Sequence, residues 1–151
     1  MSFFNSKLRY ALCAAADLAT QPKDTACQSR EIAARQEIPG PYLDQILASL
    51  KSAGIVRSVR GAGGGYTLAR PAERITVEDI ARAVLREDKL VTSHQDSEPI
   101  DYESASMLWV VREFEEKAEA LLTSQLNAST LSDLVRRKQS INDSLSFMPS
   151  I

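Results

Sequence analysis

The chain has 151 residues, of which 44% are hydrophobic, so it is long enough for a single domain with a buried core. It contains no apolar run of the roughly 20 residues that a membrane span needs, and its first residues lack the apolar middle of a signal peptide. Two cysteines are too few for a disulfide framework, so we expect a cytoplasmic globular protein.

Charge is unevenly distributed, although the formal net charge is only -2. Residues 1–75 carry 10 Lys and Arg against 6 Asp and Glu, whereas residues 76–151 carry 8 against 14. A basic first half and an acidic second half are typical of a chain that meets nucleic acid with one side only. Chance variation in a surface of mixed charge would give the same division, so charge alone does not establish nucleic-acid binding.

The first 36 residues predict two helices. Apolar residues recur at helical spacing over residues 6–20, and the polar segment 21–24 ends that helix. A short strand is expected at residues 25–27. Ser29 then supplies an N-cap for a short helix that runs through Gln36.

A third helix is expected from Tyr42 to Ala53. A tight turn at residues 39–41 precedes it, and Gly54 is the expected stop after it. Two short helices joined by a tight turn, the second strongly amphipathic, predict a helix-turn-helix unit. The apolar residues of the second helix follow the i, i+3, i+4, i+7 pattern of a buried face: Leu43, Ile46, Leu47 and Leu50.

The segment from Ala53 to Pro71 is the most informative part of the chain. It predicts two short strands around a five-residue turn, residues 61–65, that holds four glycines. Arg57 and Arg60 lie on the strand that enters this turn. Glycine lets the backbone approach another surface closely, and arginine at such a tip can enter the narrow minor groove of DNA. A helix followed by a basic, glycine-tipped hairpin predicts a winged helix-turn-helix, and with it DNA binding.

The second half of the chain predicts three further helices. Residues 76–79 resemble a capping box at the start of a fourth amphipathic helix, and the polar residues 87–101 predict a loop. A long helix is expected from Tyr102 to about Asn127. A last short helix follows, with the basic residues 136–138 in its final turn, ahead of a flexible tail at 139–151.

The long helix carries apolar residues at roughly heptad spacing, a pattern that cannot stay uncovered in water. Packing against its own domain is one solution. We expect instead a two-fold homodimer, which would double the DNA footprint and favour a palindromic operator. The residues expected at the dimer interface are Leu108, Val111, Phe114, Ala118, Leu121 and Leu122.

These elements predict a mainly α fold with a small β-wing, that is, a winged helix-turn-helix domain plus a long dimerisation helix. No Ser/His/Asp arrangement, metal-ligand cluster or phosphate-binding loop is evident in the sequence, so an enzyme is the weakest interpretation. The expected organisation is a DNA-binding domain at residues 1–86, an effector-region loop at 87–101, a dimerisation helix with a terminal short helix at 102–138, and the tail at 139–151.

The third helix and the wing supply the candidate contacts with double-stranded DNA. Gln45 can bind adenine N6 and N7, Asp44 can accept from cytosine N4, and Arg60 is expected in the minor groove. The alternative is that these side chains form only a solvated polar face. Four other residues suit phosphate better than bases: Arg9, Tyr42, Lys51 and Arg57. The full set of candidate DNA-binding residues is Arg9, Pro41, Tyr42, Asp44, Gln45, Ser49, Lys51, Arg57, Arg60, Gly61, Gly63, Gly64 and Gly65.

Residues 7–12, 32–36, 42–47, 108–109 and 130–134, and above all the wing motif at 53–71, share the pattern of one family. They resemble the Rrf-type winged-helix regulators, which include IscR, NsrR and CymR. The resemblance implies a homodimeric transcription regulator, usually a repressor, that dimerises through the long helix. It also implies that Asp44, Gln45 and Arg60 lie where the family reads DNA.

The resemblance also shows what this chain lacks. Cluster-binding members carry three cysteines in the loop before the long helix, and residues 91–101 contain none here. We therefore expect no iron–sulfur cluster and no other resident cofactor, as in the CymR-type members. Some cluster-less relatives sense oxidants through one thiol near the first strand, where Cys27 lies. A redox role for Cys27 and the sensing of another small ligand or cofactor are therefore both open.

The last residues suggest a protein partner. The chain ends in an apolar stretch that closes with Ile151, as CymR-type relatives do, and that resembles the serine acetyltransferase tail which docks into cysteine synthase. The hypothesis is that cysteine synthase binds this tail and that the regulator controls cysteine or sulfur metabolism. The alternatives are a tail that ends in isoleucine by chance, or a protein-interaction module in which the winged helix is only a scaffold.

Overall fold

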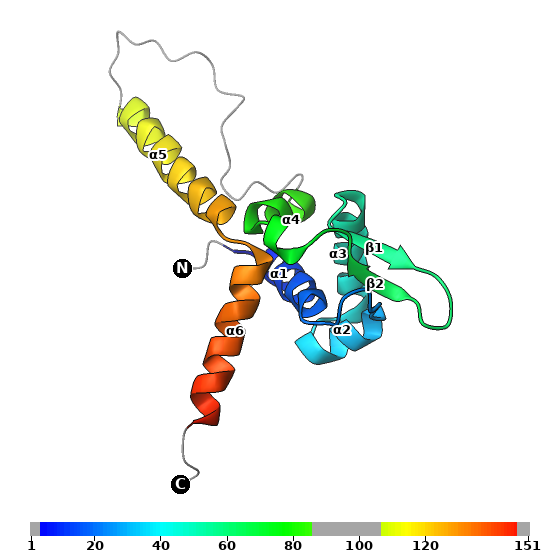
Figure 1. Cartoon of the computed structure of the whole chain (residues 1–151). Helices are drawn as coiled ribbons and strands as arrows, with labels where there is room; N and C mark the ends of the chain where they lie inside the picture. Colours follow the sequence, from blue (N-terminus) through cyan, green and yellow to red (C-terminus); the bar gives the residue numbers. More distant parts are fainter. Residues whose placement is uncertain (1–3, 86–106, 148–151) are drawn as a thin grey trace.

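The computed structural model describes residues 4–85 and 107–147. Its two strands form an antiparallel hairpin, so the predicted fold class, mainly α with a small β-wing, is confirmed. In chain order the elements are α1 (Ser6–Ala19), α2 (Ser29–Gln36), α3 (Gly40–Ser52), β1 (Val56–Val59), β2 (Gly65–Leu68), the 3-10 turn η1 (Ala72–Arg74), α4 (Val77–Val84), α5 (Met107–Ala128) and α6 (Leu131–Ser146) (Figure 1).

The core lies where α1 packs against α2, α3 and α4. Small residues of α1 have no exposed surface, among them Ala11, Ala14 and Ala15, so the neighbouring helices can approach closely. α3 buries its predicted apolar face completely, from Leu43 to Leu50. Truncating one such leucine to alanine typically costs about 2–5 kcal/mol of unfolding free energy. This packing fixes α3 in the domain and leaves its opposite face to solvent.

The helix-turn-helix begins its helices at slightly different residues from those expected. Gln28 is the N-cap of α2 in place of Ser29, and its backbone N–H donates to the Glu31 carboxylate at 2.8 Å. α3 starts at Gly40 and not at Tyr42. The prolines of the preceding turn are tolerated there because a backbone N–H in the first turn needs no partner within the helix.

The hairpin, which we call the wing, also differs in detail from the prediction. The strand expected at residues 25–27 is reduced to one β-bridge between Cys27 and Tyr66. β1 ends one residue before Arg60, so this arginine lies in the turn and not on the strand. Gly65, expected in the turn, begins β2. Arg60 is therefore part of the tip itself.

α4 and α6 begin with the same reciprocal cap. At α4 the Thr76 N–H donates to Asp79 Oδ2, and the Asp79 N–H donates to Thr76 Oγ1, both at 3.0 Å. At α6 the corresponding bonds between Thr130 and Asp133 measure 2.9 and 3.2 Å. The capping box predicted for α4 is confirmed, and α6 begins with another one.

The starts of α4 and α6 are joined by a short antiparallel β-bridge, which we call the α4–α6 joint. Its hydrogen bonds run from the Val77 N–H to the Ser129 carbonyl at 2.8 Å and from the Leu131 N–H to the Ile75 carbonyl at 2.9 Å. The joint ties the end of α5 and the start of α6 to the winged domain through the backbone.

The last helix is longer than expected. α6 has 16 residues and ends at Ser146, so the prediction of a short helix that ends near Lys138 is wrong. The basic residues 136–138 lie in its middle and not in its final turn. Ile141 and Leu145 continue the helical apolar spacing after Lys138, although the polar residues between them conceal the pattern in the sequence.

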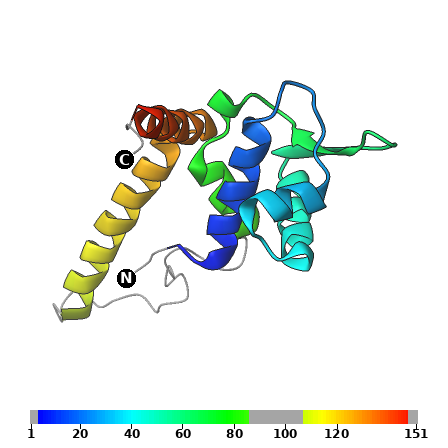
Figure 2. The ribbon, with the colours of Figure 1, turned by 90° about the horizontal axis from the view of Figure 1, so that it is seen from below.

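α5 and α6 project from the winged domain in different directions (Figures 1 and 2). None of the described helices has the length and apolar character needed to cross a membrane. Three predictions fall outside the described residues: the loop at 87–101, the first turn of the long helix at 102–106, and the end of the tail at 148–151.

Candidate nucleic-acid interface

α3 presents a polar face on the side opposite its buried leucines. Asp44, Gln45 and Ala48 are exposed on this face, and Pro41 is exposed at the start of the helix. The Ser49 hydroxyl donates to the Gln45 carbonyl at 3.1 Å, so this side chain is engaged with its own helix. The structure therefore brings the two predicted base-reading side chains together near the N-terminus of α3, from which helix-turn-helix proteins usually contact bases.

Tyr42 lies at the junction of α3 and α1. Its ring packs edge-on against Tyr10, with the ring centroids 5.6 Å apart and 83° between the ring planes. This contact fixes the start of α3 against α1, a role that sequence reasoning missed. Arg9 on α1 and Lys51 near the end of α3, two of the predicted phosphate-contacting side chains, are both exposed.

The glycines of the wing have different physical roles. A Cβ atom at Gly65 would lie 2.3 Å from the Cys27 carbonyl oxygen, and Gly65 has a φ of 146°, which side chains rarely allow. A Cβ atom at Gly64 would lie 2.4 Å from the Val59 carbonyl oxygen. A Cβ atom at Gly63 would meet nothing within 4 Å. Gly64 and Gly65 are thus required by the wing itself, whereas Gly63 faces open space.

Two backbone hydrogen bonds attach the wing to the segment between α1 and α2. The Cys27 N–H donates to the Tyr66 carbonyl at 2.9 Å, and the Tyr66 N–H donates to the Cys27 carbonyl at 2.7 Å. Cys27 itself is buried, with 4% of its surface exposed. The close approach that Gly65 permits and this pair of bonds therefore hold the base of the wing to the domain.

The two arginines of the wing have different surroundings. Arg57 on β1 forms an ion pair with Asp24 at 3.3 Å, a contact across 33 positions that the sequence did not predict. Arg60 is exposed in the turn and forms no ion pair with any residue that the structure describes. Arg60 therefore projects from the tip, while Arg57 is held at the base of the wing.

An ion pair between a buried carboxylate and a partly exposed guanidinium orients the two helices before α3. The Asp17 side chain is 3% exposed, accepts from Arg35 at 2.7 and 3.0 Å, and also accepts from Gln36 Nε2 at 2.8 Å. The hydrogen bond from Arg35 to Asp17 raises the pKa of Arg35 above its ordinary value, so this guanidinium stays charged. The network joins α1 to the end of α2 and so fixes the orientation of α2 relative to α1.

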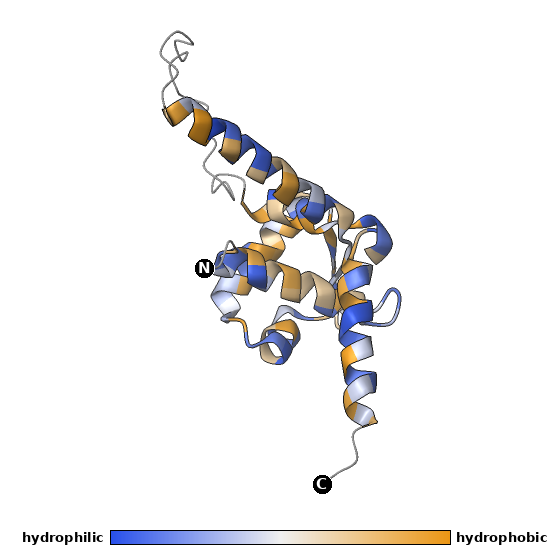
Figure 3. Ribbon diagram, turned by 90° about the vertical axis from the view of Figure 1, so that its left-hand side faces the viewer, coloured by the Kyte–Doolittle hydropathy of each residue, from blue (hydrophilic) through white to orange (hydrophobic). Residues whose placement is uncertain are grey.

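α5 carries the predicted apolar residues, and all of them except the half-buried Leu122 are exposed in the single chain. Figure 3 colours the ribbon of this helix by hydropathy, with apolar segments in orange. Leu121 is 74% exposed and Phe114 is 71% exposed, while only Leu126 of the described helix is buried. Leu108 and Val111 are also exposed, as the interface prediction requires. Three neighbours extend the apolar surface at the start of the helix: Met107, Trp109 and Val110.

A helix-turn-helix followed by a glycine-tipped wing defines the winged-helix class of DNA-binding domains. The model of the Rrf2 family, described as iron-dependent transcriptional regulators, matches residues 4–137. The chain therefore belongs to the Rrf2 family of transcriptional regulators, which is a family of regulators and not of enzymes.

Individual relatives agree with this assignment. The IscR regulator of Cereibacter sphaeroides is 48% identical over 82 residues, which are 53% of each chain. The solved structure of T. potens IscR has a TM-score of 0.74 and 29% identity, and the match covers 98% of this chain and 93% of that one. The structure of CymR, the global cysteine regulator of B. subtilis, has a TM-score of 0.69 and 29% identity, with coverage of 91% and 98%. The match spans about half of the length of the first curated relatives.

Proposed function

We propose that the protein is a homodimeric, sequence-specific DNA-binding transcription regulator, and that it acts as a repressor without an iron–sulfur cluster. One observation carries the proposal: the exposed polar face of α3 lies in the same domain as a wing whose tip carries Arg60. In this arrangement α3 enters the major groove, where Asp44 and Gln45 meet base edges, and Arg60 enters the adjacent minor groove.

Dimerisation is supported by the apolar face of α5. Side chains such as Phe114 and Leu121 would contact water in a monomer, and an apolar surface of this kind is normally covered. A second copy that crosses on α5 covers it and presents two α3 helices to two half-sites of a palindromic operator. A repressor of this kind binds over the promoter and excludes the polymerase.

The direct test measures DNA affinity against salt. Arg9, Lys51 and Arg57 supply about six phosphate contacts in a dimer, so affinity is expected to fall roughly a thousandfold between 50 and 200 mM salt. Fluorescence anisotropy with promoter fragments measures this dependence. A protein that shows no preference for any promoter fragment at low salt is instead the interaction module, and the proposal fails.

Two substitutions separate base readout from phosphate contact. Arg60→Ala is expected to reduce discrimination between operator and random DNA by about tenfold or more. Lys51→Ala is expected to weaken binding to both DNAs alike and to lower the salt slope by about two units, because each dimer loses two phosphate contacts. If both variants lose affinity for the two DNAs equally, Arg60 does not read the minor groove.

The donor atoms of the chain do not fit an iron–sulfur cluster. Such clusters are held mainly by cysteine thiolates, commonly four, and this chain has two cysteines. Cys13 is exposed on α1, whereas Cys27 is buried under the wing. Among the described residues, no three His, Cys, Asp or Glu side chains are grouped to hold a metal ion. Anaerobic treatment with iron and sulfide is expected to give no cluster absorption, and a stable chromophore would contradict this part of the proposal.

Cys27 is the candidate for a redox response. Its backbone holds the wing through Tyr66, so oxidation of the thiol would disturb the attachment of the wing. Its burial restricts the access of an oxidant, so the response requires opening of the wing. Mild peroxide is expected to weaken DNA binding of the native protein. An unchanged response in Cys27→Ser would remove Cys27 from the proposal.

A role in cysteine or sulfur metabolism is the final part of the proposal. It is supported by the likeness to the CymR structure and by the apolar residues of the segment 147–151, of which residues 148–151 lie outside the described part of the chain. In this scheme cysteine synthase binds the terminal residues as a co-regulator. Deletion of Ile151 is expected to abolish capture of purified cysteine synthase, and equal capture by the full and shortened chains would exclude that partner.

A further inference from the structure

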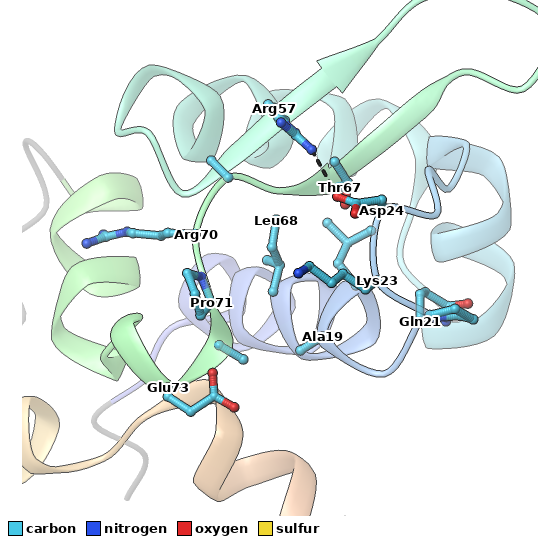
Figure 4. A pocket seen from close by; sticks show the side chains of 14 residues that line it. Ala19, Gln21, Lys23, Asp24, Arg57, Thr67, Leu68, Arg70, Pro71 and Glu73 are labelled. Atoms are coloured by element: carbon cyan, nitrogen blue, oxygen red, sulfur yellow. Dashed lines mark hydrogen bonds and ion pairs between the residues drawn. The ribbon is translucent and has the colours of Figure 1, made fainter.

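A hollow of about 500 Å³ lies at the base of the wing, within the size range of small-molecule sites (Figure 4). We call it the wing-base hollow. It is lined by residues 18–19 at the end of α1, by residues 21–24 of the following loop, by residues 67–73 from β2 to η1, and by Arg57 of β1. Of the candidate DNA-binding residues, only Arg57 lines it.

One side of the wing-base hollow is apolar. Leu18 is 5% exposed, and Leu68 and Ala72 are half-buried against the hydrophobic core. Figure 4 shows Leu68 between the strands and α1, beside Lys23 and Pro71. This apolar floor suits a short hydrocarbon group, because contact with it removes apolar surface of both from water.

Two charged side chains at the hollow, one cation and one anion, are exposed and have no ion-pair partner among the described residues. Arg57 is paired with Asp24 at 3.3 Å, and Arg70 is paired with Asp79 at 3.3 Å. Lys23 and Glu73 form no ion pair with any residue in the described part of the chain. They come from different segments, Lys23 from the loop after α1 and Glu73 from η1 (Figure 4).

We propose that the wing-base hollow binds a free α-amino acid with a small aliphatic or uncharged side chain. Its carboxylate meets the Lys23 ammonium, and its own ammonium meets the Glu73 carboxylate. Its side chain lies on the apolar floor. A zwitterion meets both charges at once and gains two charge-assisted hydrogen bonds, whereas a simple anion or a simple cation gains only one.

Such a ligand would regulate the wing, a consequence that rests on the proposed DNA-binding function. The bound carboxylate lies on the side of the hollow where Asp24 pairs with Arg57, so it competes with Asp24 for that guanidinium. It also links the loop after α1 to the segment that follows β2. Because Arg57 is a candidate phosphate contact, occupancy of the hollow is expected to weaken DNA binding about fivefold or more.

The binding itself is tested on the full chain without DNA. Isothermal titration calorimetry is performed with L-valine, with valinamide, which lacks the carboxylate, and with 3-methylbutanoate, which lacks the ammonium. L-Valine is expected to bind at up to millimolar concentration, and each analogue about tenfold more weakly, the loss of one hydrogen bond to a charged group. L-Alanine, L-leucine, L-serine and L-cysteine then define the preferred side chain.

Two variants test the assigned contacts. Lys23→Gln and Glu73→Gln are each expected to lower the affinity for L-valine about tenfold, with the melting temperature retained because both side chains are exposed. Glu116→Gln on α5 is the matched control and is expected to bind L-valine as the native chain does.

Three results would overturn the site: no binding of any of the five amino acids, equal binding of L-valine and 3-methylbutanoate, or unchanged affinity in both Lys23→Gln and Glu73→Gln. The regulatory consequence is judged separately by anisotropy with L-valine present. If DNA affinity is unaltered at saturating L-valine, the regulatory consequence is refuted, but the binding site is not. Failure of the protein to bind any DNA would refute the proposed function, while calorimetry would still decide the site.

Discussion

Replacement of Gly65 by alanine tests the attachment of the wing most directly. The new Cβ would lie 2.3 Å from the Cys27 carbonyl oxygen, so β2 has to move away from Cys27, and the two backbone hydrogen bonds between Tyr66 and Cys27 are lost. Those bonds contribute about 0.5–1.5 kcal/mol each, and a side chain at a φ of 146° adds about 1–3 kcal/mol of strain. The sum is about 2–6 kcal/mol of unfolding free energy. For a chain of this length it corresponds to a fall of roughly 5–20 °C in melting temperature.

Gly63→Ala is the matched control, since it places the same methyl group two residues away in open space. Differential scanning calorimetry compares the stability of the two variants, and anisotropy at low salt compares their affinity for DNA. Gly65→Ala is expected to lose both stability and DNA affinity, and Gly63→Ala to retain stability. Equal melting temperatures in the two variants would refute the argument that Gly65 is required by the approach to Cys27.

Three further predictions concern the other elements. Asp17→Ala should lower the unfolding free energy by about 1–3 kcal/mol in urea unfolding, a moderate value because Arg35 is 41% exposed; an unchanged midpoint would show that the pair has no structural weight. The hydrogen bond from the Thr130 backbone N–H lowers the pKa of Asp133. The ionised carboxylate therefore stabilises the start of α6 at pH values above its ordinary pKa of 3.8, and this effect is lost as the pH falls through the lowered pKa. Asp133→Asn should remove this acid dependence of the helical circular dichroism signal. If the proposed dimer forms along α5, Leu121→Glu should convert it to a monomer in light scattering, and a dimer of undiminished affinity would place the interface elsewhere.

The sequence predicted the helix-turn-helix and the wing because both depend on local patterns. The spacing from Leu43 to Leu50 defines a buried helical face without any knowledge of the neighbouring helices. Four glycines within residues 61–65 indicate a tight turn. These elements were confirmed with boundaries displaced by one or two residues.

Contacts between distant residues were not predictable in this way. The pairing of Asp17 with Arg35 and of Asp24 with Arg57 depends on how the loop after α1 folds back, which no local spacing encodes. The length of α6 was underestimated because its apolar positions are separated by serine, asparagine and aspartate, which favour turns. The different roles of the wing glycines likewise require the position of Cys27, a residue far from them in sequence.

The α4–α6 joint has a consequence for the geometry of an assembled pair. If two copies meet along α5, the spacing of their α3 helices depends on the two peptide–peptide hydrogen bonds at residues 75–77 and 129–131 of each copy, together with the packing of α5 on α4 and of α6 on α1. Main-chain bonds do not depend on side-chain identity, so substitutions on the exposed face of α5 can change the strength of association while this joint is retained. A proline at position 77 or 131 removes one of these donors and is the substitution that would alter that spacing.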